Sequence, residues 1–528
     1  MTSSLLNLYP SYCFDDILIR PRHSDIQSRS DISLDIEVAK APRSLKLKIP
    51  LISSPMDTVT EENMATQMAL NGGMGIIHRF MPIEEQVKQV TNVKRYITYI
   101  FTDPYKMNIN SSMSELDDHV EDTHVYTVCV MDNNNNFKGL VTKRDIDFFK
   151  EISRNDKIDN IMTPFNNIIA LYKDGNIFKE MMRNNKSNQF KKCMEECKQK
   201  MIEHTIEKIP ILEIKNVKNS NKKLFTKNLL GVVTWKSVQF YFNNHKTAAL
   251  DNKGCLRVGG SIGIKPGYLD DATKLVEAGA DIINIDVANG HNQYTIDACK
   301  NVRQKFPNIV IFVGNVCTFE GFKNLALNTD VDCVRVGIGN GSICSTRLET
   351  GIGYGLFSSI FECFKFKMSP EYKNTIGNVK ILCDGGTMGK TGNKVKGLAA
   401  GCSLFFMGKT LASCEESPGQ IVIRNNKRVK YFRGMASTMA NLSKQERQNK
   451  KRKLNTAFTA EGVDGEVELK GSVSETIQQI CGGIRSGLSY LGCQNIDELH
   501  ELNEQDKIEF ALSTTTGLSE SKTRVKKF

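Results

Sequence analysis

Short apolar runs that end in glycine, aspartate or asparagine recur along this chain, and they constrain its fold more than any other feature. In the C-terminal half such runs occupy 281–286, 309–315, 331–336, 379–386 and 403–409. Helical segments alternate with them, so the pattern predicts repeated strand–loop–helix units. This alternation is typical of parallel α/β folds, in which each helix returns the chain to the next parallel strand.

The N-terminal residues repeat the same pattern. An apolar run at 49–53 enters a small polar loop, Thr60 and Glu61 then open a helix, and a strand at 74–77 follows. Counted with the C-terminal runs, these units predict a closed (β/α)8 TIM barrel. The competing fold is an open doubly wound sheet, but no Gly-x-Gly-x-x-Gly motif opens a helix after the first strand.

An internal repeat interrupts this pattern between residues 96 and 251. Strands at 125–131 and 137–142 lead into a helix, and the segments 209–214 and 229–237 repeat that order. We therefore expect a second domain inserted between two barrel segments. The expected division is a first barrel segment at 1–95, the insertion at 96–251, a second barrel segment at 252–500 and a C-terminal tail at 501–528.

The composition excludes several classes of protein. The chain has 40% hydrophobic and 24% charged residues, and no run of about 18 apolar residues or secretory signal is found, which predicts a cytoplasmic protein with no membrane partner. Fifteen cysteines without paired Cys-x-x-Cys spacing argue against a disulfide framework or a zinc site. Cys193 and Cys197 are interpreted as surface thiols. The net charge is +11, but no nucleic-acid-binding motif accompanies it.

The glycine-rich segment 337–347 places a thiol and a hydroxyl directly after a predicted strand. Its glycines allow a sharp turn and a close approach to a ligand. A thiol is a strong nucleophile at neutral pH and needs a nearby proton carrier, and Cys344 and Thr346 supply both groups. The alternative is that Cys344 is a small buried apolar residue, as most free cysteines are.

Two later strand ends, 384–386 and 408–409, are also rich in glycine and are expected to face this loop. Glycine amides in late barrel loops commonly cradle a phosphate, and Asp384 beside them is a natural acceptor for ribose hydroxyls. The alternative is that Asp384 caps the helix that follows. A second ligand surface is predicted at 286–291, with Asn315 on the next strand.

At this point the motifs resemble the IMP dehydrogenase/GMP reductase family. The segments that carry the resemblance span nearly the whole chain, at 14–18, 54–60, 75–78, 314–316, 341–347, 384–386, 417–419 and 433–435. The repeated insertion resembles a tandem pair of CBS domains. The resemblance implies that this pair binds adenine or guanine nucleotides and regulates the enzyme.

The resemblance also implies a shared chemistry, in which the Cys344 thiolate attacks C2 of a purine nucleotide while Thr346 and Glu461 relay a proton. Substrate would be bound by Ser342, Asp384, Gly385, Gly386, Gly408, Lys409, Gly434, Met435, Ala436 and Gly462. A nicotinamide cofactor would be bound by Ser28, Arg29, Arg79, Asp286, Val287, Ala288, Asn315, Ile338, Gly339, Ser486 and Ser489, with Ser28 and Arg29 reaching a neighbouring subunit. A monovalent cation such as K⁺ would be held at Gly339, Gly341, Cys344 and Arg347.

The two branches of the family differ in a mobile flap, expected here near 436–470. The dehydrogenase uses an Arg-Tyr pair on the flap to activate water, and the reductase needs no such base. Here Gln448 follows Arg447 and the flap has no Arg-Tyr pair. This favours the reductase branch, which converts GMP to IMP and ammonia with NADPH. The segments 286–290, 350–354 and 482–486 resemble the reductase as well.

Other residues favour the dehydrogenase branch, which converts IMP to XMP with NAD. The segment 459–465 resembles it. The Arg-x-Ser that precedes the glutamate in the reductase is absent, because Phe458 and Ala460 occupy those positions. A third hypothesis, of another class, is a catalytically silent nucleotide sensor. The family resemblance implies a homotetramer, with octamers formed through the CBS pair.

Overall fold

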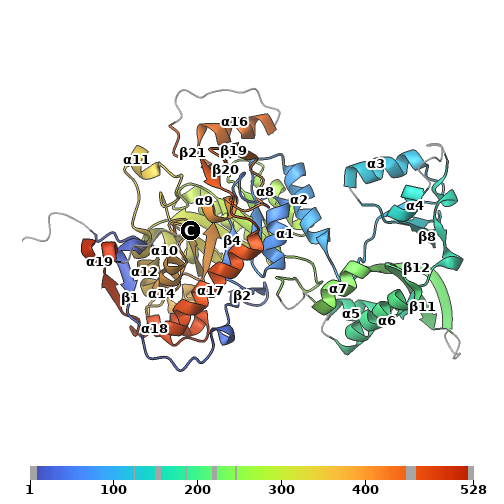
Figure 1. The fold of residues 1–528 in the computed structure, drawn as a ribbon, viewed down its shortest axis with the longest axis horizontal. Helices are drawn as coiled ribbons and strands as arrows, with labels where there is room; N and C mark the ends of the chain where they lie inside the picture. The colour runs from blue at the N-terminus through green and yellow to red at the C-terminus, as the bar shows by residue number, and fades with distance from the viewer. Residues whose placement is uncertain are drawn as a thin grey trace, which may run out of the picture. The chain divides into compact units, whose positions relative to one another are not determined.

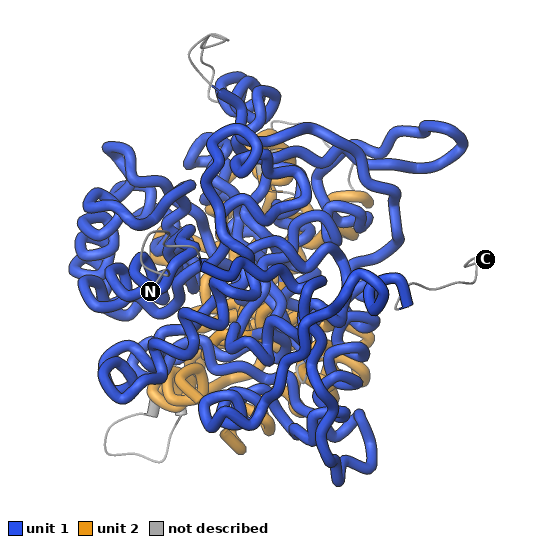
Figure 2. Tube along the Cα trace, turned by 90° about the vertical axis from the view of Figure 1, so that its left-hand side faces the viewer, with its two compact units in different colours: residues 1–96, 247–249, 256–528 blue, residues 97–246, 250–255 orange. Residues whose placement is uncertain are grey.

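The computed structural model describes residues 9–123, 125–148, 156–184, 187–216, 223–243, 247–447 and 459–520. The chain forms two compact units, which are coloured separately in Figure 2. Unit 1 consists of 1–96, 247–249 and 256–528, and unit 2 consists of 97–246 and 250–255. The chain therefore leaves unit 1 after residue 96 and returns to it within the stretch 247–256.

Unit 1 is built on a closed barrel of parallel strands in the order β13-β14-β15-β16-β17-β18-β4-β5. Closure comes from two pairings, because β5 pairs with β13 and β18 pairs with β4, each in parallel. The predicted TIM barrel is confirmed, and the open doubly wound sheet is wrong. The strands are β4 (Leu51–Ser53), β5 (Met74–Ile77), β13 (Val258–Ile262), β14 (Ile282–Asp286), β15 (Val310–Val316), β16 (Cys333–Val336), β17 (Lys380–Asp384) and β18 (Leu404–Met407).

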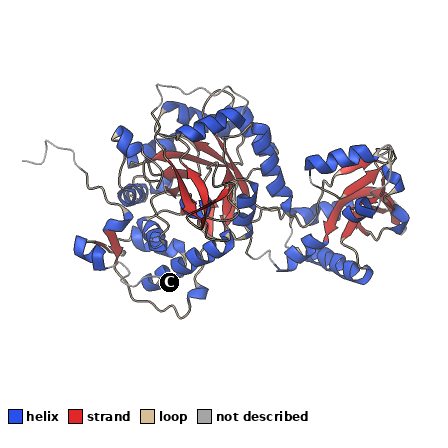
Figure 3. Ribbon diagram, turned by 45° about the horizontal axis from the view of Figure 1, so that its top comes forward, coloured by secondary structure: helices blue, strands red, loops and turns tan. Residues whose placement is uncertain are grey.

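The barrel strands are buried along nearly their whole length, because each has the barrel interior on one side and helices on the other. Figure 3 shows this arrangement as strands enclosed by helices. The covering helices, several of them labelled in Figure 1, include α1 (Glu62–Leu70), α2 (Ile83–Tyr96), α8 (Tyr268–Glu277), α9 (Gln293–Lys305), α10 (Phe319–Asn328), α12 (Leu356–Lys367), α14 (Thr391–Ala400) and α17 (Val473–Leu491).

Smaller elements extend the barrel. Two antiparallel pairs join β1 (Ile17–Ile19) to β22 (Phe510–Leu512) and β2 (Ile36–Ala39) to β3 (Leu45–Leu47). The expected C-terminal tail therefore contributes β22 to a sheet with the N-terminal residues. A three-stranded sheet of β19 (Ile421–Arg424), β20 (Lys427–Arg433) and β21 (Asp464–Glu468) frames the expected flap, which contains α16 (Thr438–Arg447).

Unit 2 contains two copies of one arrangement, as the internal repeat predicts. In each copy a parallel pair and an antiparallel pair share their middle strand, and a helix follows. The first copy has β6 (Lys106–Asn108), α3 (Met113–Thr123), β7 (Val128–Met131), β8 (Phe137–Val141) and α4 (Lys143–Phe148). The second has β10 (Leu171–Asp174), α5 (Gly175–Arg183), α6 (Asn188–His204), β11 (Lys208–Asn216), β12 (Lys223–Thr234) and α7 (Trp235–Asn243).

The structure corrects the interpretation of Cys193 and Cys197 as surface thiols. Both lie on α6 and are fully buried. Phe190, Met194 and Met201 are buried on the same helix, so the residues at spacings of three, four and seven form one apolar face. Over the described ranges, none of the helices is long and apolar enough to span a bilayer.

Candidate active site

The cysteine loop follows β16 and is shaped by glycines with positive φ. Gly337 and Gly339 have φ of 139° and 74°, a conformation that favours residues without a Cβ. A Cβ at Gly337 would lie 2.7 Å from the carbonyl oxygen of Asp384, and a Cβ at Gly385 would lie 3.1 Å from the Gly341 nitrogen. The loops that follow β16 and β17 therefore meet through their backbones, as the sequence predicts.

Cys344, Thr346 and Glu461 form one hydrogen-bonded chain. The Cys344 Sγ atom lies 3.2 Å from Thr346 Oγ1, and the Thr346 hydroxyl donates to Glu461 Oε2 at 2.8 Å. Backbone bonds hold the two segments together, because Ser345 N donates to Glu461 O at 3.0 Å and an antiparallel bridge joins Cys344 to Gly462. Cys344 is half-buried and has a polar partner, so it is not the buried apolar filler of the alternative interpretation.

The predicted base-binding residues lie against this chain. A Cβ at Gly434 would approach Ile343 O to 3.0 Å and the Cα of Gly462 to 3.1 Å, so these segments pack closely through their backbones. Met435 Sδ accepts a hydrogen bond from the Asp57 nitrogen at 3.4 Å. Ala436 follows and is exposed.

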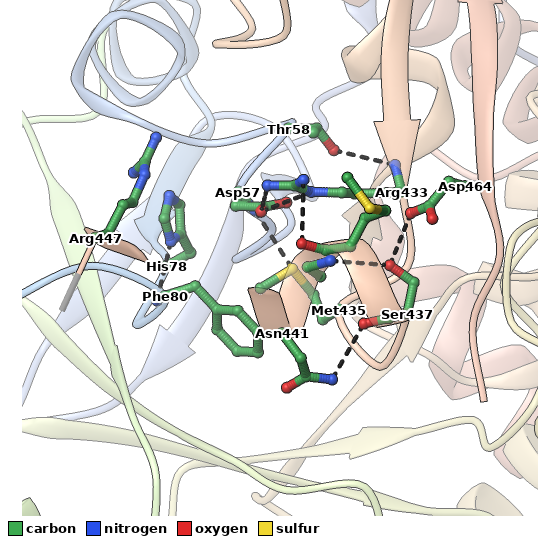
Figure 4. Close-up of polar contacts among 12 residues, drawn as sticks. Asp57, Thr58, His78, Phe80, Arg433, Met435, Ser437, Asn441, Arg447 and Asp464 are labelled. Atoms are coloured by element: carbon green, nitrogen blue, oxygen red, sulfur yellow. Dashed lines mark hydrogen bonds and ion pairs between the residues drawn. The ribbon is translucent and has the colours of Figure 1, made fainter. Parts of the chain in front are cut away.

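The Arg433–Asp57 ion pair and the Ser437–Asp464 hydrogen bond anchor this segment, as Figure 4 shows. Arg433 Nε donates to Asp57 Oδ2 at 2.9 Å, and Ser437 Oγ donates to Asp464 Oδ1 at 2.7 Å. The Asp57 side chain is almost fully buried. The segment 434–436 is therefore fixed at both ends, directly after β20 on one side and just before α16 on the other.

A network of ion pairs and hydrogen bonds links four neighbouring barrel strands, β14 to β17. Arg335 in β16 donates to Asp286 Oδ1 at 2.6 Å and to Asp384 Oδ2 at 2.9 Å, and Asn315 also donates to Asp384 Oδ2, at 2.7 Å. Burial opposes the charge of Arg335, but the carboxylates of Asp384 and Asp286 outweigh it and raise the pKa of its guanidinium. Burial likewise acts to raise the pKa of Asp286, yet Arg335 and Arg79 lower it.

Backbone hydrogen bonds join the two parts of the predicted second ligand surface, the loop 286–291 and Asn315 on the next strand. Asn315 N donates to Val287 O at 2.8 Å, and Gly290 N donates to Asn315 O at 2.6 Å. Arg79 Nε contacts Asp286 at 3.4 Å, and Ala288 is exposed beside them. The Asn315 Oδ1 atom is buried without a hydrogen-bond partner, so a polar group of a ligand would fit here.

The glycine-rich ends of β17 and β18 also approach each other. Gly386 N donates to Asn340 O at 3.0 Å, and a Cβ at Gly389 would lie 3.5 Å from Thr410 Oγ1. Gly408 and the exposed Lys409 begin α15 (Lys409–Ala412). The exposed Ser342 lies two residues beyond Asn340.

Asp384 does not cap the helix that follows it. The N-cap of α14 is Lys390, and the Asp384 carboxylate instead accepts from Arg335 and Asn315. Both of these bonds use Oδ2. The capping alternative is therefore wrong, and the Oδ1 atom is not involved in either bond.

The main chain of the cysteine loop fits a monovalent cation in part. Gly341 O accepts from Cys344 N at 3.1 Å and Arg347 O accepts from Gly351 N at 3.2 Å, whereas the carbonyl oxygens of Gly339 and Cys344 accept no hydrogen bond from the residues the structure describes. Those residues also contain no cluster of three or more His, Cys, Asp or Glu side chains suited to a metal ion. Any cation here would rely on carbonyl oxygens.

Four predicted cofactor residues lie in a separate group. Arg29 stands over the ring of Tyr490 at 5.9 Å, and Ser489 Oγ donates to Ser486 O at 2.7 Å, so Ser28 and Arg29 lie beside α17. Among the described residues this group makes no hydrogen bond, ion pair or ring contact with the cysteine loop. Ile338, by contrast, is part of that loop and half-buried.

The described part of the flap ends in an ion chain. Arg447 at the end of α16 contacts Glu61 Oε1 at 3.0 Å, and Glu61 in turn contacts His78 Nε2 at 3.2 Å. Burial acts to raise the pKa of Glu61, but the hydrogen bond to His78 and the charge of Arg447 lower it. Gln448 and Phe458, on which the distinction between the branches depends, lie outside the described residues. Figure 4 shows Arg447 and His78 near the Asp57 ion pair.

Sequence reasoning missed Arg335 and the two acidic residues Asp57 and Glu61. Arg335 pairs with two carboxylates, and Asp57 and Glu61 each pair with an arginine from a distant part of the chain, so the pairings are visible only after the barrel closes. The one available signal was Arg335 within a largely apolar strand at 331–336, since a buried arginine requires a counter-ion.

Known proteins resemble this chain over nearly its whole length. A family model described as IMP dehydrogenase / GMP reductase domain matches residues 11–524. The inosine-5'-monophosphate dehydrogenase of Nitrosopumilus maritimus is 34% identical over 516 residues, covering 96% of this chain and 97% of that one. The dehydrogenase of Staphylococcus aureus is 34% identical over 514 residues, covering 97% and 95%.

The similar solved structures are of a protein with a different name, GMP reductase. A cysteine-to-alanine variant of the GMP reductase of Trypanosoma brucei in complex with guanosine 5'-monophosphate has a TM-score of 0.80, 30% identity and 99% coverage of both chains. The same enzyme in complex with guanosine 5'-triphosphate has a TM-score of 0.70 and 26% identity, and covers 96% of this chain and 99% of its own.

Proposed function

This chain belongs to the IMP dehydrogenase/GMP reductase family of oxidoreductases, and we propose that it is a GMP reductase that converts GMP to IMP and ammonia with NADPH. One observation carries the proposal. The segment 436–470 contains no tyrosine, so Arg447 has no phenol beside it to activate water. The Arg447 guanidinium is also engaged by Glu61 at 3.0 Å. A dehydrogenase must hydrolyse its covalent intermediate, whereas a reductase does not.

The hydrogen-bonded chain supports the chemistry of the first step. Thr346 Oγ1 lies 3.2 Å from the Cys344 sulfur and 2.8 Å from Glu461, so the thiol proton passes through the hydroxyl to the carboxylate. The thiolate attacks C2 of GMP, and the 2-amino group leaves as ammonia after Glu461 returns a proton to it through Thr346. NADPH supplies the hydride for C2. The C–S bond then breaks, and IMP and the free cysteine are released.

The neighbouring loops support nucleotide binding. The Asp384 Oδ1 atom is the proposed acceptor for the ribose hydroxyls, since Oδ2 serves Arg335 and Asn315. The glycine-rich segments 385–386 and 408–409, together with Ser342, are proposed to hold the phosphate. The segment 434–436 is proposed to contact the base. Asn315 Oδ1 and the loop at 286–290 are proposed to meet the nicotinamide cofactor.

The test is absorbance at 340 nm in two reactions. We expect absorbance to fall with GMP and NADPH, with IMP and ammonia as products, and to stay constant with IMP, NAD and K⁺. Cys344→Ala is expected to abolish turnover and to leave GMP binding intact. A rise in the second reaction, with none of the loss in the first, would overturn the reductase assignment.

The second candidate is IMP dehydrogenase. Curated relatives of that name are 34% identical over nearly the whole chain, which is the observation in its favour. It requires a group other than a flap tyrosine to activate water. If the second reaction proceeds, Arg447→Ala should stop hydrolysis and leave the formation of NADH in the first turnover intact.

We also propose that unit 2 is a CBS pair that binds purine nucleotides and regulates the barrel. The repeated strand order supports this, as does the T. brucei reductase solved with guanosine 5'-triphosphate. Unit 2 has a cavity of about 770 Å³, a volume suited to a nucleotide, lined in part by Lys179, Arg183 and Lys215. Addition of ATP, GTP or GMP should change the activity or the size of the assembly, and the absence of both changes would contradict the proposal.

A further inference from the structure

Lys394 in unit 1 is a buried cation that has no counter-ion among the described residues. Lys394 in the first turns of α14 is 0% exposed, although its ammonium carries a charge that is expensive to bury. Its Nζ atom contacts only Thr387 Oγ1 and Lys390 O, each at 3.5 Å. Within the described residues it forms no ion pair. Such a charge usually lies beside a carboxylate or another anion.

Lys394 lies directly behind one of the glycine-rich loops. Thr387 is buried, follows Gly385 and Gly386, and donates its backbone nitrogen to Gly385 O at 2.8 Å. The Lys394 ammonium can only donate, so Thr387 Oγ1 accepts from it. The hydrogen of the Thr387 hydroxyl then remains available for an acceptor on the far side of the loop.

The surroundings of Lys394 disfavour its charge when no ligand is bound. Burial lowers the pKa of the ammonium to about 8. The Cys383 thiol in β17 opposes this effect, and Lys390, the N-cap of α14, is paired with Asp15 at 2.8 Å. An anion placed on the other side of Thr387 would supply the missing negative charge.

We propose that Lys394 positions the phosphate of the substrate nucleotide, with Thr387 as the intermediary and the phosphate as its missing counter-ion. The inference rests on the proposed nucleotide function. Lys394 itself does not touch the reacting atoms, and it acts through the Thr387 hydroxyl. It therefore contributes to nucleotide affinity and contributes little to the chemical step.

The test compares Lys394→Met with Lys396→Met in the full chain. Lys396 lies on the same helix but donates to Phe14 O at 2.8 Å, so it controls for loss of a lysine from α14. Dissociation constants are measured for GMP, IMP and guanosine. We expect Lys394→Met to weaken GMP and IMP about ten- to hundredfold, as expected for a lost hydrogen bond to a charged group, and to leave guanosine unchanged.

Two further readouts separate positioning from a structural role. Lys394→Met should raise KM for GMP with kcat within about twofold, and its melting temperature without ligand should equal or exceed that of the wild type, because a buried unpaired charge is removed. Should this variant fail to fold, Thr387→Val replaces it. Thr387→Val should weaken GMP more than guanosine, and equal loss for both would overturn the inference.

The outcomes distinguish this inference from the proposed function. If the wild type binds neither GMP nor IMP, the proposed function fails. If it binds them and Lys394→Met binds them equally well, the proposed role of Lys394 is wrong and the function stands. Equal weakening of GMP and guanosine by Lys394→Met would show a structural role and would overturn the inference.

Discussion

Two buried cations, Arg335 and Lys394, contact the segment 384–387, and they differ in the partners that surround them. Arg335 at the end of β16 has carboxylate partners at 2.6 and 2.9 Å, and its guanidinium also lies 4.8 Å from the centre of the Phe406 ring. Lys394 in α14 has no carboxylate partner among the described residues. The pKa of Arg335 is raised, whereas burial lowers that of Lys394 to about 8.

The charge of Arg335 is stabilised whether or not a ligand is bound, whereas that of Lys394 depends on a bound anion. Arg335 completes its electrostatic network within the chain, so it fixes Asp286 and Asp384 before any ligand arrives. Lys394 leaves its network incomplete, so its charge is stabilised only when an anion binds. A site that binds a charged ligand needs both kinds of group, one to hold its shape and one to respond to the ligand.

The largest expected effect is that of Arg335→Met. Removal of this guanidinium leaves the partly buried carboxylates of Asp286 and Asp384 without the cation that they share, which should destabilise the fold by about 3–5 kcal/mol. Urea unfolding measures the change. The matched variant is Lys394→Met, which should cost less than about 1 kcal/mol or should stabilise the protein. Equal losses in the two variants would remove the contrast between the cations.

Asp384→Asn tests a residue with two roles. Its carboxylate accepts from Arg335 and Asn315, and it is also the proposed acceptor for the ribose hydroxyls. The amide oxygen can still accept from Asn315 and Arg335, so we expect a modest loss of stability of about 1–2 kcal/mol. Loss of the carboxylate toward the ribose should lower kcat/KM for GMP about ten- to hundredfold. Steady-state kinetics and urea unfolding on one preparation check both values. A large loss of stability with unchanged kinetics would assign Asp384 to the fold alone.

The barrel could be predicted from the sequence because each strand is recognised from a short run of neighbouring residues. Each strand is an apolar run ended by Gly, Asp or Asn, and β5 at Met74–Ile77 occupies the residues expected of it. The ends of parallel strands meet at one rim, so Cys344 and Asp384 were expected to face each other, and their loops are in backbone contact. Neither inference required knowledge of side-chain packing.

The ion pairs were not predictable in the same way. An arginine in a strand shows that a counter-ion is needed, but the register between β14, β16 and β17 decides that Asp286 and Asp384 supply it. Lys394 also gave no signal, because a lysine early in a helix is normally exposed. Cys193 and Cys197 were misinterpreted for a related reason, since the apolar face of α6 is interrupted by many charged residues.

A third test of the comparison uses the pH dependence of Lys394. Its pKa is about 8 in the folded protein and 10.5 unfolded, so the unfolded state binds more protons between these values and stability should rise with pH there. Below pH 8 both states are protonated and the full penalty remains. The difference in unfolding free energy between wild type and Lys394→Met isolates this effect. GMP should flatten the difference, and an unchanged slope with GMP would contradict the proposed phosphate contact.

The smallest effect concerns the flap, where the ion pair is only partly buried. Arg447 contacts Glu61 at 3.0 Å and Glu85 at 3.8 Å, and their side chains keep 34, 21 and 43% of their exposure. Such pairs contribute at most about 1 kcal/mol. Glu61→Gln should therefore leave global stability nearly unchanged while proteolysis within 438–447 accelerates about fivefold or less, the factor that corresponds to that energy.

Glu85→Gln is the control for the flap, since its contact with Arg447 is longer and more exposed. It should accelerate proteolysis less than Glu61→Gln does. The folded pKa of Glu61 lies below 4.5, so its contribution is present above that pH and is lost as the pH falls through the folded value. An acid-stable protease should then cleave wild type and Glu61→Gln at the same rate. If wild type and Glu61→Gln are cleaved at the same rate at neutral pH as well, Glu61 does not hold Arg447, and Arg447 then remains available for the water chemistry of a dehydrogenase.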